Sequence, residues 1–395
     1  MRYDLLLKQG LVIDPGNNRH EVMDIAVHRG RVAAVQADIP AEEALEVLDV
    51  RGLIVTPGLI DAHLHVYTNS CDMGVHTDKY CVSSGVTTAC DAGSTGALNF
   101  PGLRELLTRA IRTRFHVFLN FSLIGITGVE VSGELADRRF ADSEACIRTI
   151  AGNRDLIKGI KLRVGPGLTW DPHEALQLAR QTADAAQVPL MVHVTNSPIP
   201  LSEVLGYLQR GDVLTHPFHG FTNGILNPDR TAILKPIWEA QERGVLFDSA
   251  HGRMGHFNFD VVRKAIGLGF MPDLITTDLS IPSATRGPVF NLVTTMSKFL
   301  NFGMSLQDII WRTTAKPAEH LGVSADLGHL GVGAIADIAV LELQEGAFEF
   351  MDTDQNVITE QRRLVAVYTL RDGRVCYRKG EDIAAANIKP RTIFD

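Results

Sequence analysis

Two histidines two residues apart, His63 and His65, follow an apolar run in the stretch 59–67 (LIDAHLHVY). In a strand, alternate side chains share a face, so the two imidazoles would point the same way. Histidine nitrogen is a common zinc ligand, so the pair could form half of a metal site. Two hydrogen-bonded structural histidines at a strand end would give the same pattern. The choice depends on what the rest of the chain places beside them.

Most of the later apolar runs also end in ionisable side chains. These are Asp91, Lys161 and Arg163, His193, His216 with His219, His251, and Asp278. If the runs are the strands of one parallel barrel, their carboxyl ends meet at one rim. Fourteen histidines scattered at random would not collect in this way. The coincidence favours a metal centre over isolated structural histidines.

Lys161 is unusual in such a set, because an ammonium is a poor metal ligand and costly to bury. Strand alternation places Lys161 on the same face as Arg163 and Lys158 on the opposite face. Spacing alone leaves two interpretations open. Lys161 is either a buried ion-pair or substrate-binding cation, or a lysine that has reacted with carbon dioxide to form a carbamate able to bridge two metals.

The segments that must position these residues alternate between strand-like and helix-like patterns. Apolar runs lie at 58–66, 85–94, 115–122, 156–164, 188–196, 211–220, 244–252 and 272–280, and helices are expected at about 101–113, 140–152, 172–187, 199–210, 230–243, 258–268 and 288–301. Eight such units predict an α/β chain with a (β/α)8 TIM barrel. A doubly wound sheet would carry a glycine-rich turn where this chain has its two histidines.

Both ends of the chain read as short alternating strands broken at Gly and Asn. We expect residues 1–56 and 323–395 to form one small β-sandwich domain and residues 57–322 to form the barrel. The glycine-containing loop 125–140 follows the third strand. It is either a mobile flap over the site or an oligomer contact.

Composition excludes several classes of protein. The 395 residues carry a net charge of −8 without a basic tract, so no nucleic-acid partner is expected. No apolar run approaches the roughly 20 residues of a membrane helix, and the start of the chain lacks a signal-peptide layout. Five cysteines without a CxxC pair indicate a reduced, cytoplasmic setting.

The motifs resemble the amidohydrolase superfamily, and within it the dihydroorotase-like metallohydrolases, including those labelled amidohydrolase/deacetylase. The resemblance rests on LIDAHLHVY, GVTTACDAGS (85–94), TTDLS (276–280), TTAKPAEHLG (313–322) and GHLGVGAIADIAVLE (328–342), together with the lysine and single histidines between them. It implies two divalent metal ions: one is held by His63, His65 and Asp278, the other by His193 and His216, and a carboxylated Lys161 bridges them. Nitrogen and oxygen ligands of this kind suit zinc, with manganese or iron as alternatives.

By this resemblance the chain is a metal-dependent hydrolase. It would cleave an amide or ester bond in a small acylated, carboxylate-bearing or cyclic amide compound. A hydroxide bridging the metals would attack the carbonyl, with Asp278 as general base and then acid. His251 is expected to hydrogen-bond the scissile carbonyl or to orient Asp278. Dihydroorotases of this type carry an arginine just after H-x-H, where this chain has Val66-Tyr67-Thr68-Asn69, so orotate chemistry is not expected.

The candidate substrate contacts are Tyr67, Asn69, Arg163, Asn196 and Arg286. Arg163 could grip a carboxylate with two hydrogen bonds or pair with a rim acid such as Asp91. Two rival functions stay open: a mononuclear deaminase of a nucleobase ring, and a non-catalytic scaffold that kept the fold. Lys161 argues against the first, and the full ligand set against the second. A small-molecule substrate and a homo-oligomer are expected.

Overall fold

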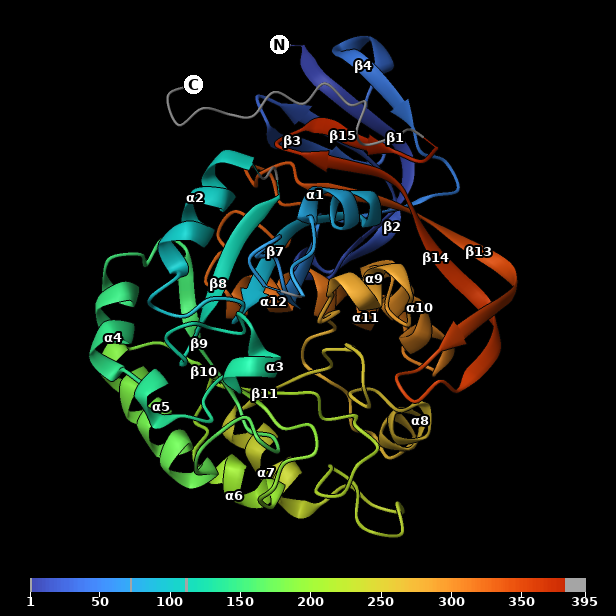
Figure 1. Cartoon of the computed structure of the whole chain (residues 1–395). Coiled ribbons are helices and arrows are strands. Elements are labelled where there is room, and N and C mark those ends of the chain that lie inside the picture. Colours follow the sequence, from blue (N-terminus) through green and yellow to red (C-terminus); the bar gives the residue numbers. More distant parts are fainter. Residues whose placement is uncertain (1, 72, 111–112, 381–395) are drawn as a thin grey trace.

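The structure, a computed structural model, describes residues 2–71, 73–110 and 113–380. Within these ranges it contains two sheets, one parallel with seven strands and one mixed with eight (Figure 1). Helices run around the outer side of the parallel sheet, while the mixed sheet gathers strands from both ends of the chain. The molecule is therefore of the α/β class that the sequence predicts.

The parallel sheet keeps its strands in chain order. They are β6 (Leu59–Leu64), β7 (Val86–Ala92), β8 (Arg114–Asn120), β9 (Ile157–Arg163), β10 (Leu190–His193), β11 (Val213–Thr215) and β12 (Leu246–Asp248). Six of the seven lie inside the predicted apolar runs, and β8 begins one residue before its run, at Arg114. Parallel bridges pair Leu64 with Leu279 and Asp248 with Leu274. The segment 274–279 therefore contacts the first and the last strand, which curls the sheet.

The eighth predicted strand, 272–280, differs from expectation, because only isolated bridges form there in the described structure. Hydrogen bonds from threonine side chains take the place of part of the backbone pairing between strands. The Thr277 hydroxyl donates to Asp61 Oδ2 at 2.6 Å, and the Thr276 hydroxyl donates to Asp248. Asp278 has a φ of 48°, outside the strand region. The local bend ends any regular pairing and turns the Asp278 side chain toward the histidines.

Helices follow the strands as the periodicity predicts. The longer ones are α2 (Phe100–Ala110), α4 (Ser143–Ala151), α5 (Pro172–Ala186), α7 (Lys235–Arg243), α8 (Phe259–Gly267), α10 (Leu292–Asn301) and α11 (Leu306–Thr313). Shorter ones are α1 (Thr77–Tyr80), α3 (Val129–Ser132), α6 (Leu201–Gly206), α9 (Ile281–Thr285) and α12 (Ala315–His320). Asp171 and Asn258 cap α5 and α8 by accepting from backbone N–H groups. In the described ranges, none of these helices has the length and apolar character required to cross a bilayer.

Strand alternation divides the parallel sheet into two faces. Leu190 and Val192 face the surrounding helices, whereas Met191 packs with Phe118 and with Leu321 of the α12 end. The interior of the curled sheet is thus apolar at the end opposite to the carboxyl ends of the strands, and α12 covers that end. Polar side chains on the same inward face are left to collect at the carboxyl ends of the strands.

The mixed sheet has the order β15-β14-β13-β5-β1-β2-β3, with β4 paired to β1. Its strands are β1 (Tyr3–Asp14), β2 (Arg19–His28), β3 (Arg31–Gln36), β4 (Ala44–Asp49), β5 (Ile54–Pro57), β13 (Ile338–Met351), β14 (Val357–Arg371) and β15 (Arg374–Arg378). Strands from both termini pair as expected, through β5 and β13. Residues 381–395 of the predicted β domain lie outside the described residues, and the division at 56 and 323 stays a prediction.

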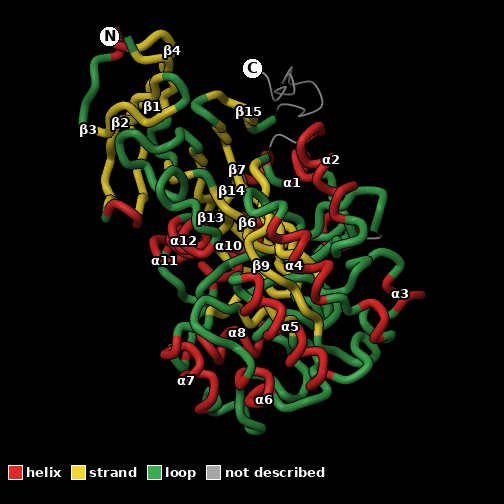
Figure 2. The backbone as a smooth tube through the Cα atoms, turned by 90° about the vertical axis from the view of Figure 1, so that its left-hand side faces the viewer, coloured by secondary structure: helices red, strands yellow, loops and turns green. Residues whose placement is uncertain are grey.

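The β13–β14 hairpin extends beyond the mixed sheet and reaches down beside α10 and α8 (Figures 1 and 2). Leu364 N donates to Ser297 Oγ of α10 at 2.9 Å. At the tip, Thr353 exchanges hydrogen bonds with Phe257, just before α8. The terminal strands thus contact the loop that follows β12.

We predict that His116 makes the protein less stable in mild acid. Burial lowers the pKa of this imidazole to about 4, and the nearby Lys158 and Arg114 charges act in the same direction. The unfolded chain binds the proton near pH 6.5, so the free energy of unfolding should fall as pH drops from about 6.5 to about 4. His116→Phe should reduce this slope by up to about 1.4 kcal/mol per pH unit, measured by urea denaturation across the range. An unchanged slope would show that His116 is protonated in the folded state.

Candidate metal centre

Six side chains predicted as metal ligands lie together at the carboxyl ends of the parallel strands. They are His63, His65, Lys161, His193, His216 and Asp278, and all are buried. Asp278 Oδ1 lies 3.1 Å from His65 Nε2 and 3.5 Å from His63 Nε2. Lys161 Nζ lies 3.3 Å from His63 Nε2. The structure therefore brings the first, fourth and eighth runs to one point.

The other two histidines complete the group. The ring centroids of His193 and His216 are 4.3 Å apart, and those of His63 and His216 are 5.4 Å apart. One potential ligand atom from each of His63, His216 and Asp278 lies within 4.8 Å of the others. Such a spacing suits groups that share a cation, and the ligand roles themselves stay a prediction.

Neighbouring acceptors fix the orientation of three of these imidazoles. His63 Nδ1 lies 2.7 Å from Asp248 Oδ2, and His216 Nδ1 lies 2.8 Å from Ala250 O. His65 Nδ1 lies 3.0 Å from Ser94 Oγ. Each Nδ1 is thereby occupied, which leaves Nε2 to face the centre. Metal-binding histidines commonly carry an outer partner of this kind.

Asp248, the partner of His63, is fully buried. Burial acts to raise the pKa of its carboxyl, but the hydrogen bonds from His63, Thr276 and Thr215 outweigh it and hold the pKa below its usual value. Thr215 Oγ1 donates to the same oxygen that contacts His63, at 2.9 Å. Asp248 is therefore a carboxylate whose position is fixed from three sides.

The protonation states suit metal binding. Burial holds the pKa of His193 and His216 well below the usual range, so both imidazoles are neutral. Burial would raise the pKa of Asp278, but hydrogen bonds from His256 and His65 outweigh it and keep the pKa well below its usual value. Neutral imidazoles and a carboxylate are the forms in which these residues coordinate cations.

Lys161 is 1% exposed and forms no ion pair within 4.0 Å in the described ranges. Burial lowers the pKa of its amine to about 8, although Asp278 and Asp248 act in the opposite direction. An amine, rather than an ammonium, is the form that reacts with carbon dioxide. A carbamate would replace a poorly compensated cation by an anion among imidazoles, so the surroundings fit the predicted modification.

Sequence reasoning missed His256, which belongs to the same group. Its Nδ1 lies 3.3 Å from Asp278 Oδ2, and its ring centroid is 4.2 Å from that of His216. The chain reaches this position through a loop with positive φ at Ala250, Gly252, Met254 and Gly255. The sequence does show a second histidine five residues after His251. It does not show that the loop turns back and brings this histidine to the cluster.

The two predicted roles of His251, contact with the scissile carbonyl or orientation of Asp278, stay predictions. Its Nε2 lies 2.6 Å from Lys298 Nζ, and its ring stacks on Phe257 at a centroid distance of 4.2 Å. Its Nδ1 lies 3.3 Å from Gly252 O. Both ring nitrogens therefore face groups outside the histidine cluster.

The residues predicted to contact the substrate do not form one group, unlike the predicted metal ligands. Arg163 is half-buried and donates to Glu134 Oε2 at 3.1 Å, so its partner is a different acid from Asp91. Glu134 lies in the loop 125–140 and is fully buried, a placement that its sequence context did not indicate. The Tyr67 hydroxyl lies 3.5 Å from Asn99 O. The remaining candidates, Asn69, Asn196 and Arg286, are exposed at loop positions.

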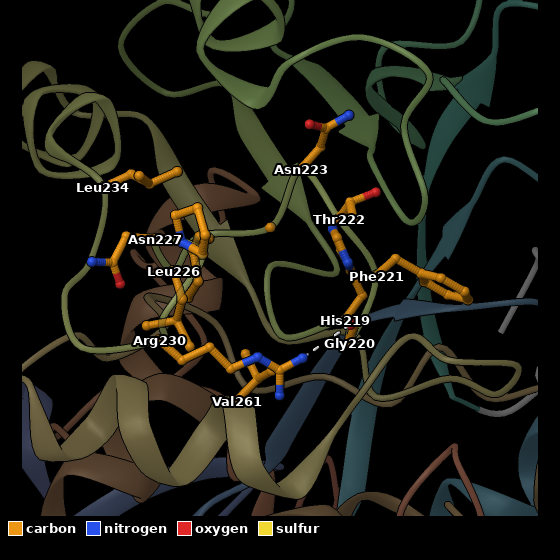
Figure 3. A pocket seen from close by; sticks show the side chains of 13 residues that line it. His219, Gly220, Phe221, Thr222, Asn223, Leu226, Asn227, Arg230, Leu234 and Val261 are labelled. Carbon is orange, nitrogen blue, oxygen red and sulfur yellow. Dashed lines mark hydrogen bonds between the residues drawn. The ribbon is translucent and has the colours of Figure 1, made fainter.

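A pocket of about 520 Å³ lies in the loop that follows β11 (Figure 3). Its wall runs from His219 to Pro228 and includes Arg230, which donates to Gly220 O at 3.3 Å. His219 is buried, and neither ring nitrogen has a hydrogen-bond partner among the described residues. The pocket wall contains none of the predicted ligands, so this hollow is separate from the centre.

Comparison with known proteins identifies close relatives over nearly the whole chain. The model of the amidohydrolase family matches residues 54–376. A deacetylase of Enterococcus faecalis is 33% identical over 379 residues, which is 95% of this chain and 99% of that protein. A deacetylase of Agrobacterium fabrum is 32% identical over 368 residues, 92% of this chain and 86% of the relative. A dihydroorotase of Aquifex aeolicus is 24% identical over 450 residues.

Solved structures give the same result. The crystal structure of an adenine deaminase superimposes with a TM-score of 0.87 and 32% identity, over 95% of this chain and 100% of the other. That of a dihydroorotase gives a TM-score of 0.85 and 30% identity, over 94% and 97%. These matches confirm the resemblance drawn from the motifs.

We predict that Asp248→Asn weakens metal binding without unfolding the protein. Asparagine keeps the shape but presents a neutral oxygen to His63 Nδ1, so the imidazole loses a charged partner. Losses of about 10- to 100-fold in metal affinity are usual for such changes. Zinc titration against a chelator measures the effect, and Asp326→Asn, whose carboxylate is exposed, is the control. Equal affinity in the two variants would contradict the orienting role.

Proposed function

This chain belongs to the amidohydrolase family, and from that premise we propose that it hydrolyses the amide or ester bond of a small acylated compound. The hydrolase class follows from the family and from its deacetylase relatives. The observation that carries the proposal is the buried Lys161 amine beside four imidazoles and Asp278, without an ion-pair partner among the residues that the structure describes. A substrate bearing a carboxylate, or a cyclic amide, would fit the same chemistry.

We assign His63, His65 and Asp278 to one divalent metal ion and His193 and His216 to a second. Carboxylated Lys161 would be shared by both. The Nε2 atoms that face the centre and the neutral imidazoles of His193 and His216 support this assignment. When bound, the two ions would acidify water and polarise the substrate carbonyl, chemistry for which zinc, manganese or iron is suitable.

Asp278 is the proposed proton carrier. Its Oδ1 faces His65 and His63, while Oδ2 faces His256, so the carboxylate is held at both ends. It takes the proton from the attacking water and passes it to the leaving nitrogen or oxygen. A carboxylate is a weak base, but it is strong enough to take a proton from a water molecule whose pKa a bound metal ion has lowered.

The wider architecture supports this assignment. A curled parallel sheet, bridged at both edges by 274–279, is the arrangement expected of a (β/α)8 barrel over residues 57–322. The mixed sheet would be the small β-sandwich domain. We further propose a homo-oligomer that acts in the cytoplasm on a small molecule. Subunit contacts and cellular location are tested independently of the chemistry, by sedimentation and fractionation.

A mononuclear deaminase is the second candidate, because an adenine deaminase structure is 32% identical to this chain. Deamination of a ring would need only one metal ion and no bridging lysine. Metal content separates the two functions, since two ions per chain favour the hydrolase. A screen of N-acyl and O-acyl acids, cyclic ureas, imides and adenine on zinc- or manganese-loaded protein identifies the bond that is cleaved.

Asp278→Asn should lower kcat by about 10²- to 10⁴-fold, because the amide cannot accept the proton. Metal should remain bound through the histidines, which elemental analysis would verify. The outcome that removes Asp278 from proton transfer is near-normal turnover in a fully loaded variant.

Lys161→Ala should reduce the metal content from two ions per chain and abolish most activity, because the shared ligand is lost. Lys158→Ala is the matched control: it lies on the same strand, is half-buried and lies outside the cluster. Metal content by elemental analysis and turnover are measured in both variants. A Lys161→Ala protein that keeps two ions and full turnover would contradict the carbamate assignment.

A further inference from the structure

We propose that Lys298 is a positioning residue, which acts through His251 to hold His256 against Asp278. The inference rests on the proposed function, in which Asp278 carries the proton. It concerns a lysine that lies in α10, outside the predicted ligand set, and a loop whose conformation the sequence did not predict.

Lys298 is 1% exposed and has three hydrogen-bond acceptors around its Nζ. These are His251 Nε2 at 2.6 Å, Met351 O at 2.7 Å and Pro288 O at 2.8 Å. Burial holds the pKa of this amine well below its usual value. The three acceptors nevertheless match the three N–H donors of the charged form, each of which is used. The acceptors come from three separate segments: the loop after β12, the segment after α9, and the β13–β14 hairpin. One side chain therefore ties three parts of the chain together.

His251 transmits this constraint to the site. Because its Nε2 accepts from Lys298, its Nδ1 carries the proton and donates to Gly252 O. Its ring lies flat on Phe257, with an interplanar angle of 17°. Phe257 is the residue next to His256, so the stack fixes the loop directly beside the imidazole that contacts Asp278.

The hairpin holds the other side of the loop. Phe257 N donates to Thr353 Oγ1 at 2.8 Å, and Thr353 N donates to Phe257 O at 3.1 Å. Phe259 N donates to Asp352 Oδ2 at 3.1 Å. His256 is thus bracketed by anchored residues. Two non-glycine residues of the loop, Ala250 and Met254, have positive φ, a conformation that needs such external contacts to persist.

A purely stabilising role explains this arrangement poorly. Replacing a buried charged group by an apolar one of similar size is often neutral or stabilising. A buried lysine that lies over the Phe259 ring and contacts only neutral acceptors is therefore a costly way to gain stability. Three short hydrogen bonds with fixed directions do define a geometry, which is what the 3.3 Å contact between His256 and Asp278 requires.

The test compares Lys298→Met and His251→Phe with the unchanged full chain, loaded with zinc. Methionine removes the donors, and phenylalanine keeps the stack on Phe257 but cannot accept. Both should lower kcat by about 10- to 100-fold, since small misplacements at a reacting group have effects of this size. KM should change less than about twofold, because substrate binding does not use His251. His251→Gln keeps an acceptor and should recover part of kcat.

A second measurement is independent of activity. Hydrogen–deuterium exchange of the amides at 252–258 should be faster in Lys298→Met, while zinc content stays the same. Lys316→Met is the matched control, because that lysine is also largely buried but pairs with Glu319 away from the loop. If Lys298→Met fails to fold, Thr353→Val, which removes only the Oγ1 contact, takes its place.

The outcomes are distinct. Unchanged exchange at 252–258 together with unchanged kcat overturns the positioning role. A fall in melting temperature without a change in kcat, or a loss of kcat that His251→Gln does not relieve, also overturns it. If the unchanged protein hydrolyses none of the acyl compounds, the proposed function fails, and the exchange measurement alone then decides whether Lys298 holds the loop.

Discussion

Burial of Lys161 is the constraint on which the proposed centre depends. A buried lysine must be neutral, have acceptors for all its donors, or be chemically modified, because an uncompensated ammonium is strongly disfavoured there. Here the nearest groups are imidazole and thioether, at 3.3 Å from His63 Nε2 and 3.5 Å from Met191 Sδ. Neither neutralises a cation. The proposed centre resolves this imbalance, because the negative charge of a Lys161 carbamate and the positive charge of the metal ions would compensate one another.

The same logic explains the outer partners. Asp248 sits beneath His63, and Ala250 O and Ser94 Oγ beneath the other imidazoles. Asp248 is the last residue of β12, and Ala250 and Ser94 lie two residues beyond β12 and β7. Three of the six predicted ligands, His63, Lys161 and His193, lie within strands, and the other three, His65, His216 and Asp278, lie just beyond strand ends or at the bridged segment 274–279, whereas His256 and Glu134 come from longer loops. The predicted metal ligands thus lie at the carboxyl edge of the sheet, and the loops add His256 and Glu134 around them.

Much of this arrangement could be predicted from the sequence. The apolar runs predicted where the strands lie, and the His, Lys and Asp residues at their ends predicted which side chains meet at the carboxyl edge of the sheet. Both predictions follow from the alternation of side chains along a strand and from the parallel arrangement of the strands. Residue order could not reveal contacts made by loops. Asn69 and Asn196 are exposed, and their contact with substrate stays a prediction. His256, Glu134 and Lys298 depend on turns with positive φ or on segments far away in the chain. The bend at Asp278 escaped prediction for the same reason.

The reach of the β13–β14 hairpin has a consequence for how the protein is made. Thr353 is synthesised almost one hundred residues after Phe257, the loop residue that it holds. A growing chain that has emerged up to residue 345 already contains all six predicted ligands, yet it lacks the segment that fixes the loop after β12. The ligand set and its loop are therefore completed at different moments, and the last strands to be made finish the site.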